Sequence, residues 1–358
     1  MIDAWLATQG RQPDSFNAVE RLCYIGSRGM GALEFFLTKG PKVRTSQKIQ
    51  VEQLVKLASE VLTHCQQLAE AFGDETQKAH ALKQILQVGT SAGGARAKAV
   101  IAWNPVTHEV HSGQVKAPEG FGYWLLKFDG VSGNKAKELE DPQGYGAIEY
   151  AYYHMACDAG IQMNECRLLE EKGRKHFMTR RFDRLEHPDS GGRLHMQSLC
   201  ALAHHDFNLA GAYSYEQAMQ VIKRLQLSMH DVEQQFRRMV FNVIARNQDD
   251  HVKNIAFLME KQGTWSLAPA FDVTYSYQPA GRWTSTHQMT LNGKRDGFEL
   301  ADFVAVEKVA GLKRGQAKAI LHDVQQVVSR WRDYADAAGV SQVHCDKIQN
   351  ALRLEPFF

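Results

Sequence analysis

Short apolar runs separated by turn residues dominate the first half of the chain. Runs of about four to eight residues, bounded by Gly, Pro, Asn or Asp, are typical of β-strands. Residues 22–26 and 31–36 predict two strands that form a hairpin through residues 27–30. Further strand-like or extended segments are predicted at residues 99–103, 122–128, 166–170 and 176–184.

Helical spacing of apolar residues marks one stretch of the first half and most of the second. The apolar residues between 51 and 72 follow the i, i+3, i+4 pattern of an amphipathic helix, and a short helix is predicted over residues 82–86. The same periodicity dominates residues 194–245 and 301–354. The predicted fold class is therefore α+β, with strands concentrated in the first half and helices in the second.

Length and composition are those of a globular protein with two domains. A chain of 358 residues can bury two cores. We predict a mixed N-terminal domain over residues 1–185 and a mostly helical C-terminal domain over residues 186–358. The hydrophobic content of 44% and the charged content of 23% are ordinary. The net charge of +2 gives no basic excess, so any nucleic-acid contact would have to be a local patch.

The cysteine pattern and the N-terminus indicate a cytoplasmic protein. The six cysteines form no Cys-x-x-Cys pair, which is typical of thiols in a reducing compartment and not of a disulfide framework or a zinc site. No signal peptide is recognisable, and no apolar run approaches the ~18 residues of a membrane helix. The cysteines are Cys23, Cys65, Cys157, Cys166, Cys200 and Cys345.

The most informative stretch is a polar loop over residues 246–254. A helix-like apolar run precedes it, a strand-like run over residues 255–259 follows it, and seven of its nine residues are charged, His or Asn. Asp249 and Asn254 are separated by the spacing of a kinase catalytic loop. In such a loop the Asp receives the proton of the acceptor hydroxyl and the Asn binds magnesium.

A second carboxylate follows at the distance that phosphotransferases use. Residues 255–259 and 265–267 predict a hairpin with its turn at residues 260–263, and Asp272 comes soon afterwards. Kinases place their main magnesium ligand at this point, because positioning and charge neutralisation are the protein's main tasks in phosphoryl transfer. The alternative is a polar surface loop followed by an unrelated acidic turn.

A glycine-rich stretch over residues 88–98 leads into a strand. Its three glycines and a serine permit close approach of the backbone to a phosphate. The stretch matches neither the Walker pattern nor Gly-x-Gly-x-x-Gly, because Ala95 and Arg96 follow Gly94. The alternative is a tight turn of small residues, with Lys98 as a solvated strand end.

Lys127 is the one charged residue in the apolar strand over residues 122–128. A lysine among apolar neighbours is costly to bury without a partner. Kinases use such a lysine to bind the nucleotide phosphates and pair it with a helix glutamate, for which Glu149 is the candidate. The alternative is an edge-strand lysine that reaches solvent.

Taken together, these motifs resemble the HipA family of toxin serine/threonine kinases. The resemblance runs from about residue 20 to the end and implies a two-lobed fold like those of protein kinases and phosphoinositide kinases. Residues 194–200 also resemble the family's segment after the hinge. The motifs are Gly-Thr-Ser-Ala-Gly-Gly-Ala-Arg-Ala-Lys at 89–98, Leu-Leu-Lys at 125–127, Arg-Phe-Asp-Arg at 181–184, Asn-Gln-Asp-Asp-His-Val-Lys-Asn at 247–254 and Phe-Asp-Val at 271–273.

The resemblance implies a role for each matching residue. Asp249 would be the catalytic base, and Asn254 and Asp272 would hold Mg²⁺. Ser91 would be an autophosphorylation site, where a phosphate would repel those of ATP, although an ordinary turn serine is the alternative. The residues implied in ATP binding are Ser91, Ala92, Gly93, Gly94, Lys98, Lys127 (paired with Glu149), His251, and Arg181 and Phe182 of the adenine-side hinge.

The chain departs from the family pattern at two places. Family members begin with a further N-terminal subdomain, of which only the last strands, within residues 22–36, are expected here. The remainder would be a separate small protein, or this copy would be truncated. Asp250 lies beside Asp249, where a second carboxylate could raise its neighbour's pKa or bind metal. We choose Asp249 as the base because of its spacing to Asn254.

The leading hypothesis is therefore an ATP- and Mg²⁺-dependent serine/threonine protein kinase that acts as a toxin. The resemblance suggests an aminoacyl-tRNA synthetase as substrate and a helix-turn-helix antitoxin as partner, with DNA bound only through the antitoxin. Two alternatives are a small-molecule or lipid kinase of the same fold and a non-catalytic subunit that bridges antitoxin dimers. Magnesium-dependent ATP binding separates the last alternative from the two kinases.

Overall fold

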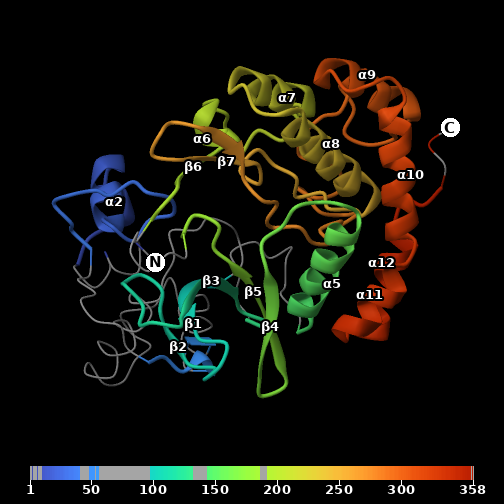
Figure 1. Cartoon of the computed structure of the whole chain (residues 1–358). Coiled ribbons are helices and arrows are strands. Elements are labelled where there is room, and N and C mark those ends of the chain that lie inside the picture. Colours follow the sequence, from blue (N-terminus) through green and yellow to red (C-terminus); the bar gives the residue numbers. More distant parts are fainter. Residues whose placement is uncertain are drawn as a thin grey trace. The chain divides into compact units, whose positions relative to one another are not determined.

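A computed structural model describes residues 2, 6, 10–40, 48–52, 54–55, 97–131, 143–185, 192–355 and 357 (Figure 1). The chain divides into two units. The first consists of Met1–Gly146 and Cys166–Arg193, and the second of Ala147–Glu165 and Leu194–Phe358. The predicted glycine-rich stretch over residues 88–96, most of the predicted helix over 51–72 and the short helix over 82–86 lie outside the described residues.

An antiparallel sheet forms the centre of the first unit, and its described part has five strands in the order β2-β1-β3-β5-β4. Apolar, β-branched and aromatic residues predominate in the strands at residues 98–103 and 122–127, which favours extended structure. The strands predicted at residues 99–103, 122–128 and 166–170 are confirmed, whereas the short β2 was not predicted. The strands are β1 (Lys98–Trp103), β2 (Val110–Ser112), β3 (Gly122–Lys127), β4 (Cys166–Glu171) and β5 (Arg174–Arg180).

The two faces of this sheet differ in character. One face packs in a hydrophobic core with residues 51–55, and Trp103 and Trp124 meet there edge to face with ring centroids 5.6 Å apart. On the opposite face, three residues lie side by side on neighbouring strands. Lys98 on β1 is opposite Lys127 on β3, which is opposite Phe177 on β5. The Lys127 ammonium lies 5.7 Å from the centre of the Phe177 ring, within the range of a cation–π contact.

A buried histidine joins β5 to the segment after β3. His176 Nδ1 accepts the main-chain N–H of Asp129 at 3.0 Å. The Asp129 carboxylate accepts the main-chain N–H groups of Gly144 (2.9 Å) and Gly146 (3.4 Å). Burial lowers the pKa of His176 to about 4, although the charge of Asp129 opposes the shift.

We expect His176→Asn to flatten the dependence of stability on pH in the acid range. The unfolded chain protonates this histidine near pH 6.5 and the folded chain only near pH 4. Stability that is complete above pH 6.5 is therefore lost as the pH falls toward 4, by roughly 3 kcal/mol. Urea unfolding at pH 7 and pH 5 measures the loss. The exposed His322→Asn serves as the control and should keep the wild-type pH dependence.

The hairpin predicted over residues 22–36 is wrong. Residues Ala18–Ile25 form the helix α2, which follows a short 3-10 helix, η1 (Pro13–Ser15). A capping box starts α2, because the Asn17 side chain accepts the Glu20 N–H at 2.9 Å and the Glu20 carboxylate accepts the Asn17 N–H. Gly26, with φ of 59°, ends the helix. The capping signal starts at Asn17, five residues before the apolar run that suggested a strand.

Helices dominate the second unit, as predicted for residues 194–245 and 301–354. Within it, α8 packs against α7, α9 and α10 (Figure 1). The helices are α5 (Tyr145–Asp158, mostly in this unit), α6 (Leu199–Leu202), α7 (Tyr215–Arg224), α8 (Met229–Ile244), α9 (Leu300–Ala310), α10 (Gln316–Val328), α11 (Trp331–Ala338) and α12 (Gln342–Ala351).

A small antiparallel sheet in this unit has the order β6-β7-β8 in the part of the chain that is described. The predicted hairpin is confirmed as β7 (Ala256–Met259) and β8 (Trp265–Leu267). The strand β6 (His195–Ser198) was expected to be helical, and that expectation is wrong. It pairs with β7 from His195 opposite Met259 to Ser198 opposite Ala256.

Tyr152 of α5 anchors the core of the second unit. Its ring meets Phe241 of α8 and Trp331 of α11 edge to face, at centroid distances of 6.2 and 5.3 Å. Its hydroxyl donates a hydrogen bond of 2.7 Å to the carbonyl of Ala245, directly after α8. The start of the polar loop is thereby held against the core. In the described ranges no helix has the length and apolarity to cross a membrane.

Candidate active site

The polar loop over residues 246–254 connects α8 to β7, as predicted. The helix begins with a capping box between Ser228 and Asp231, and its apolar side is fully buried. Its last residue is Ile244, and Arg246 then adopts a positive φ of 57°. A residue with positive φ cannot continue the helix, so the chain turns here and presents the next eight residues as a loop.

Asp249 and Asn254 are brought together inside this loop. The Asn254 side chain donates its Nδ2–H to the main-chain oxygen of Asp249 at 2.8 Å, and its main-chain N–H donates to the carbonyl of His251 at 2.8 Å. The Asp249 side chain is 48% exposed. The loop therefore presents a reachable carboxylate and fixes which end of the Asn254 amide carries the free oxygen.

Asp250, by contrast, is enclosed by three donors. Its side chain is 1% exposed, and it accepts from the Gln288 N–H (2.7 Å), the Tyr215 hydroxyl (2.6 Å) and His287 Nδ1 (2.8 Å). Burial alone raises the pKa of Asp250, but the interaction with His287 and the hydrogen bonds from Tyr215 and Gln288 outweigh it and lower the pKa. This carboxylate is ionised at neutral pH and anchors the loop.

Arg353 determines which ring nitrogen of His287 carries the proton. Arg353 Nη1 lies 3.0 Å from His287 Nε2. Because a guanidinium has only donors, Nε2 must accept, and Nδ1 is then the nitrogen that donates to Asp250. Arg353 also donates to the carbonyl of Val243 at 3.0 Å. The segment after α12 thus supports the end of α8 and the loop together.

A chain of hydrogen bonds runs behind the loop. The Asp249 N–H donates to Ser276 Oγ (2.9 Å), and Ser276 Oγ–H donates to Asn247 Oδ1 (3.2 Å). Asn247 Nδ2–H donates to Asn242 Oδ1 (2.9 Å). Asn242 Nδ2–H donates to the Tyr215 hydroxyl (3.1 Å), which binds Asp250. No sequence pattern marks Asn242, Ser276, Tyr215 or His287 as part of the site, because only the fold joins them to the loop.

Asp272 and Asn254 line the same cavity of the second unit. Asp272 follows the β7–β8 hairpin and adopts a positive φ of 57°. Carboxylate and amide oxygens are the ligands that Mg²⁺ accepts, so this pair fits the ion. Asp249 is outside the lining. The cavity is lined by Ile161, Gln235, Arg238, Phe241, Asn242, Asn247, Asp250, Asn254, Ile255, Ala270, Phe271, Asp272 and Val273.

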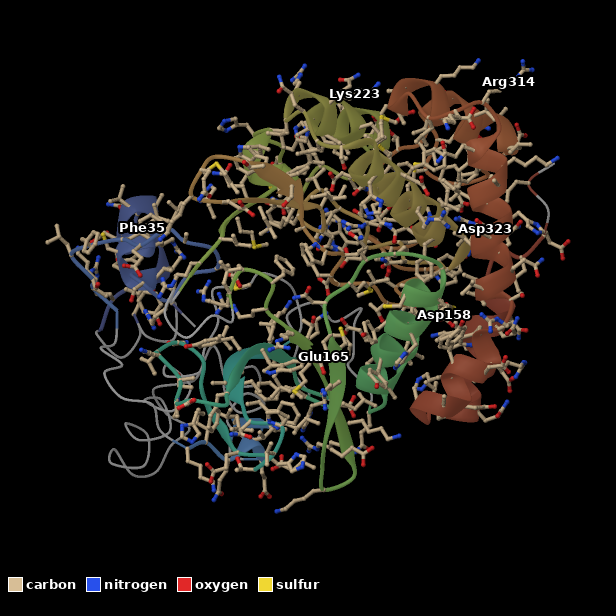
Figure 2. The ribbon with its side chains drawn as sticks, viewed as in Figure 1. Phe35, Asp158, Glu165, Lys223, Arg314 and Asp323 are labelled. Carbon is tan, nitrogen blue, oxygen red and sulfur yellow. The ribbon has the colours of Figure 1, made fainter. Side chains whose placement is uncertain are left out.

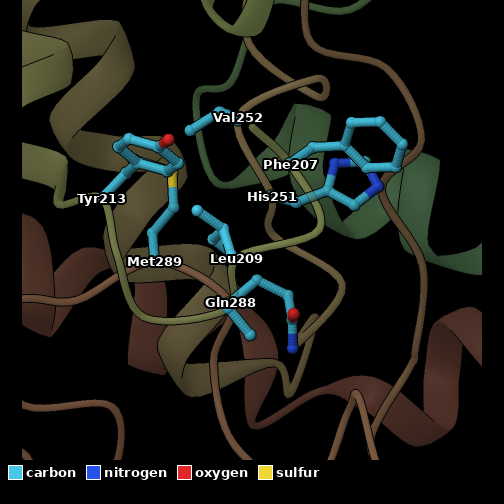
Figure 3. Close-up of a pocket in the computed structure, with 8 residues that line it drawn as sticks. Phe207, Leu209, Tyr213, His251, Val252, Gln288 and Met289 are labelled. Carbon is cyan, nitrogen blue, oxygen red and sulfur yellow. The ribbon is translucent and has the colours of Figure 1, made fainter. Parts of the chain in front are cut away.

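His251 lies at a second, mostly apolar cavity (Figure 3). Its ring meets Phe207 at a centroid distance of 6.1 Å, and its Nε2 lies 3.8 Å from Asp249 Oδ1. The predicted contact of His251 with a nucleotide stays a prediction. The lining consists of Phe207, Leu209, Ala210, Tyr213, His251, Val252, Gln288 and Met289.

The remaining predicted residues lie elsewhere. Lys98 and Lys127 face each other on the sheet of the first unit, and Lys127 is buried. Glu149 is buried on α5 and belongs to the second unit. Its ion pair with Lys127 stays a prediction. Ser91, Ala92, Gly93 and Gly94 lie outside the described residues.

Arg181 of the predicted hinge has its donors engaged within the first unit. Its main-chain N–H donates to the carbonyl of Tyr123 at 2.9 Å. Its side chain binds Asp183 through two hydrogen bonds of 2.9 and 2.7 Å. Phe182 lies between these two residues and is half-buried. Nucleotide contact by Arg181 and Phe182 stays a prediction.

Comparison with known proteins places the chain among HipA-like proteins. The family model of the HipA-like C-terminal domain matches residues 90–331. The structure is similar to the solved HipA, HipB and operator DNA complex of Shewanella oneidensis, with a TM-score of 0.66, 16% identity, and coverage of 98% of this chain and 80% of that chain. This match confirms the predicted α+β, kinase-like fold.

A second solved structure is more distant. The proinflammatory kinase CtkA of Helicobacter pylori matches with a TM-score of 0.39 and 11% identity, over 64% of this chain and 88% of that chain. No curated protein sequence matches. Among the described residues, no group of three or more His, Cys, Asp or Glu side chains is arranged to hold a metal ion. A pair of an amide and a carboxylate, such as Asn254 and Asp272, is not a group of this kind.

Proposed function

Since the chain belongs to the family of the HipA-like C-terminal domain, we propose that it is an ATP- and Mg²⁺-dependent serine/threonine protein kinase. The observation that carries the proposal is the arrangement of three side chains. Asn254 is hydrogen-bonded to the main chain of Asp249 and shares a cavity with Asp272. A phosphotransferase needs all three side chains, whereas a loop with a purely structural role does not require this arrangement.

Asp249 is the proposed base. Its carboxylate is exposed, whereas that of Asp250 is saturated by three donors. Asp249 would accept the proton of the serine hydroxyl as the hydroxyl oxygen forms its bond to the γ-phosphorus of ATP, while the bond from that phosphorus to the bridging oxygen breaks and ADP leaves. The hydrogen-bond chain through Ser276 and Asn247 holds the Asp249 backbone in place.

Asn254 and Asp272 would hold Mg²⁺ through Oδ1 of the amide and the carboxylate. When bound, the ion neutralises the phosphate charge that builds up during transfer. Lys127 and Lys98 are the proposed phosphate ligands of the first unit. Two lysines directly opposite each other repel, and a bound polyphosphate between them would offset that repulsion. Glu149 is the proposed partner of Lys127.

We also propose that the kinase is the toxin of a toxin–antitoxin pair. The similar Shewanella structure is a complex of HipA with HipB and operator DNA, which supports an antitoxin partner and DNA contact through it. The family resemblance suggests an aminoacyl-tRNA synthetase as the protein substrate and a helix-turn-helix fold for the antitoxin.

Incubation with labelled ATP and Mg²⁺, followed by mass mapping, tests the proposal. We expect incorporation of phosphate at Ser91, because the family resemblance implies autophosphorylation there. Ser91→Ala should remove the label from this position while magnesium-dependent ATP binding remains. Absence of transfer both to the chain and to added protein acceptors would contradict the kinase assignment.

A further inference from the structure

Arg238 is a buried arginine that has no hydrogen-bond partner among the residues that the structure describes. It lies on the buried side of α8, is 8% exposed, and lines the cavity that contains Asn254 and Asp272. Its Nε is fully buried. In the described part of the chain, its guanidinium makes no hydrogen bond or ion pair. Burying an ionised group is costly unless a partner of opposite charge or a set of acceptors compensates it.

Gln235, one turn earlier on α8, adds a second unsatisfied group to the same cavity. The Gln235 side chain is 1% exposed, lines the cavity and has no hydrogen-bond partner for Oε1. An amide can be rotated to present either its oxygen or its N–H₂ to a ligand. Arg238 and Gln235 therefore place up to seven N–H donors, five from the guanidinium and two from the amide, at one wall of the cavity.

The carboxylates nearby do not neutralise Arg238. Asp250 and Asp272 line the cavity, but the oxygens of Asp250 are occupied by Tyr215, His287 and Gln288, and neither carboxylate forms an ion pair with Arg238. Asp231, two helical turns earlier, is engaged at the N-terminal cap of α8. Burial lowers the pKa of Arg238 to about 9, with only the charge of Asp231 opposing this shift. The guanidinium is still charged at neutral pH, and no carboxylate in the described ranges forms an ion pair with it.

We propose that the cavity lined by Arg238, Gln235, Asn254 and Asp272 binds a phosphate-type oxyanion, which the Arg238 guanidinium holds. A guanidinium binds two oxygens of a tetrahedral anion through parallel hydrogen bonds.

The oxyanion has two chemical sources, free orthophosphate or a phosphate group of a nucleotide. The proposed binding site is the same for both sources, and binding there does not require Asp249 to act as a base. One aspect does rest on the proposed function: Mg²⁺ bound by Asp272 and Asn254 would share the cavity and strengthen binding of the anion. Dependence on Arg238 and dependence on Mg²⁺ can be measured separately.

Calorimetric and thermal titration with sodium orthophosphate tests the site. The full chain is titrated in phosphate-free buffer at constant ionic strength, with chloride as the balancing anion. We expect phosphate to raise the unfolding temperature of the wild type. Arg238→Met should lower phosphate affinity by about tenfold to a hundredfold, the loss expected for charge-assisted hydrogen bonds. Without phosphate, Arg238→Met should be at least as stable as the wild type, because an uncompensated buried charge is removed.

Two further variants keep the test decisive. Arg314→Met removes an exposed arginine before α10 and should respond to phosphate as the wild type does (Figure 2). Arg238→Lys keeps the charge but not the two-pronged geometry, so its affinity should be intermediate, and it serves if the methionine variant does not fold. An equal phosphate response in the wild type and both Arg238 variants, or no response in the wild type, would overturn the proposal.

Addition of ATP and Mg²⁺ separates the sources. Displacement of orthophosphate by ATP identifies a nucleotide phosphate as the natural occupant, and simultaneous binding identifies free phosphate; both support the site. If Mg²⁺ leaves phosphate affinity unchanged while Arg238→Met abolishes binding, the oxyanion site stands and the proposed metal site fails. If Arg238→Met has no effect while Mg²⁺-dependent ATP binding persists, the oxyanion site fails and the proposed kinase stands.

Discussion

Asp249→Asn should lower the rate of phosphate transfer from ATP by about 10²–10⁴-fold, the usual contribution of a general base. The amide cannot accept the proton of the attacking hydroxyl, but it has the same shape as the carboxylate. Because the side chain is half exposed and the loop is held through the Asp249 main chain, the fold should persist. The initial rate of label incorporation and the urea unfolding midpoint measure the two effects.

Asp250→Asn is the matched control in the same loop. It should lower the stability of the protein and leave the rate of phosphate transfer close to that of the wild type. Its side-chain nitrogen would face the Tyr215 hydroxyl or His287 Nδ1, both of which donate in the wild type. We expect a loss of about 1–3 kcal/mol in stability, typical of an unsatisfied buried group. A full loss of transfer in a stably folded Asp250→Asn protein, with Asp249→Asn active, would show that the base is assigned to the wrong neighbour.

Asp183→Ala should destabilise the first unit by about 3–5 kcal/mol, the usual effect of breaking a buried ion pair. Asp183 is fully buried and binds Arg181 and Arg184, each at 2.7 Å, and it accepts the Gly31 N–H at 2.6 Å. Burial alone raises the pKa of Asp183, but the two arginines and the Gly31 N–H outweigh it and lower the pKa. Without the carboxylate, two guanidinium groups remain with no counter-charge.

The surface pair of Asp346 and Arg332 provides the control for this variant. Their separation is also 2.7 Å, but both side chains are about half exposed. Exposed pairs contribute little to stability, so Asp346→Ala should leave the unfolding midpoint nearly unchanged. Urea unfolding followed by tryptophan fluorescence compares the two variants. Equal midpoints for Asp183→Ala and the wild type would refute the role given to the buried cluster.

Local signals made part of the fold predictable from the sequence. The central strand β3 is an apolar and aromatic run, and the β7–β8 hairpin has a turn that contains Gly263, so both were found. The strand β6 was missed because its conformation comes from pairing with β7, about 60 residues later in the chain. Residues 22–26 were misassigned because a short apolar run suits a strand and a helix equally, and the capping box before it was not used.

In the candidate site, too, local patterns could be predicted from the sequence, whereas contacts between distant residues could not. The spacing of Asp249 and Asn254 was visible because both residues lie in one loop. The different environments of Asp249 and Asp250 were not, because Asp250 is buried by Tyr215 and His287, 35 and 37 residues away in sequence. Arg238 gave no signal either. An arginine on an amphipathic helix is usually solvated, and only the packed structure shows that it lines a cavity.

Magnesium-dependent binding of ATP to the wild type and to Asp272→Asn tests the central claim most directly. Calorimetric titration should show that Mg²⁺ raises the ATP affinity of the wild type at least about tenfold, the effect of one added charge-assisted ligand. Asp272→Asn should bind ATP weakly with or without the metal while its unfolding midpoint stays close to that of the wild type. An unchanged magnesium effect in Asp272→Asn would contradict the account.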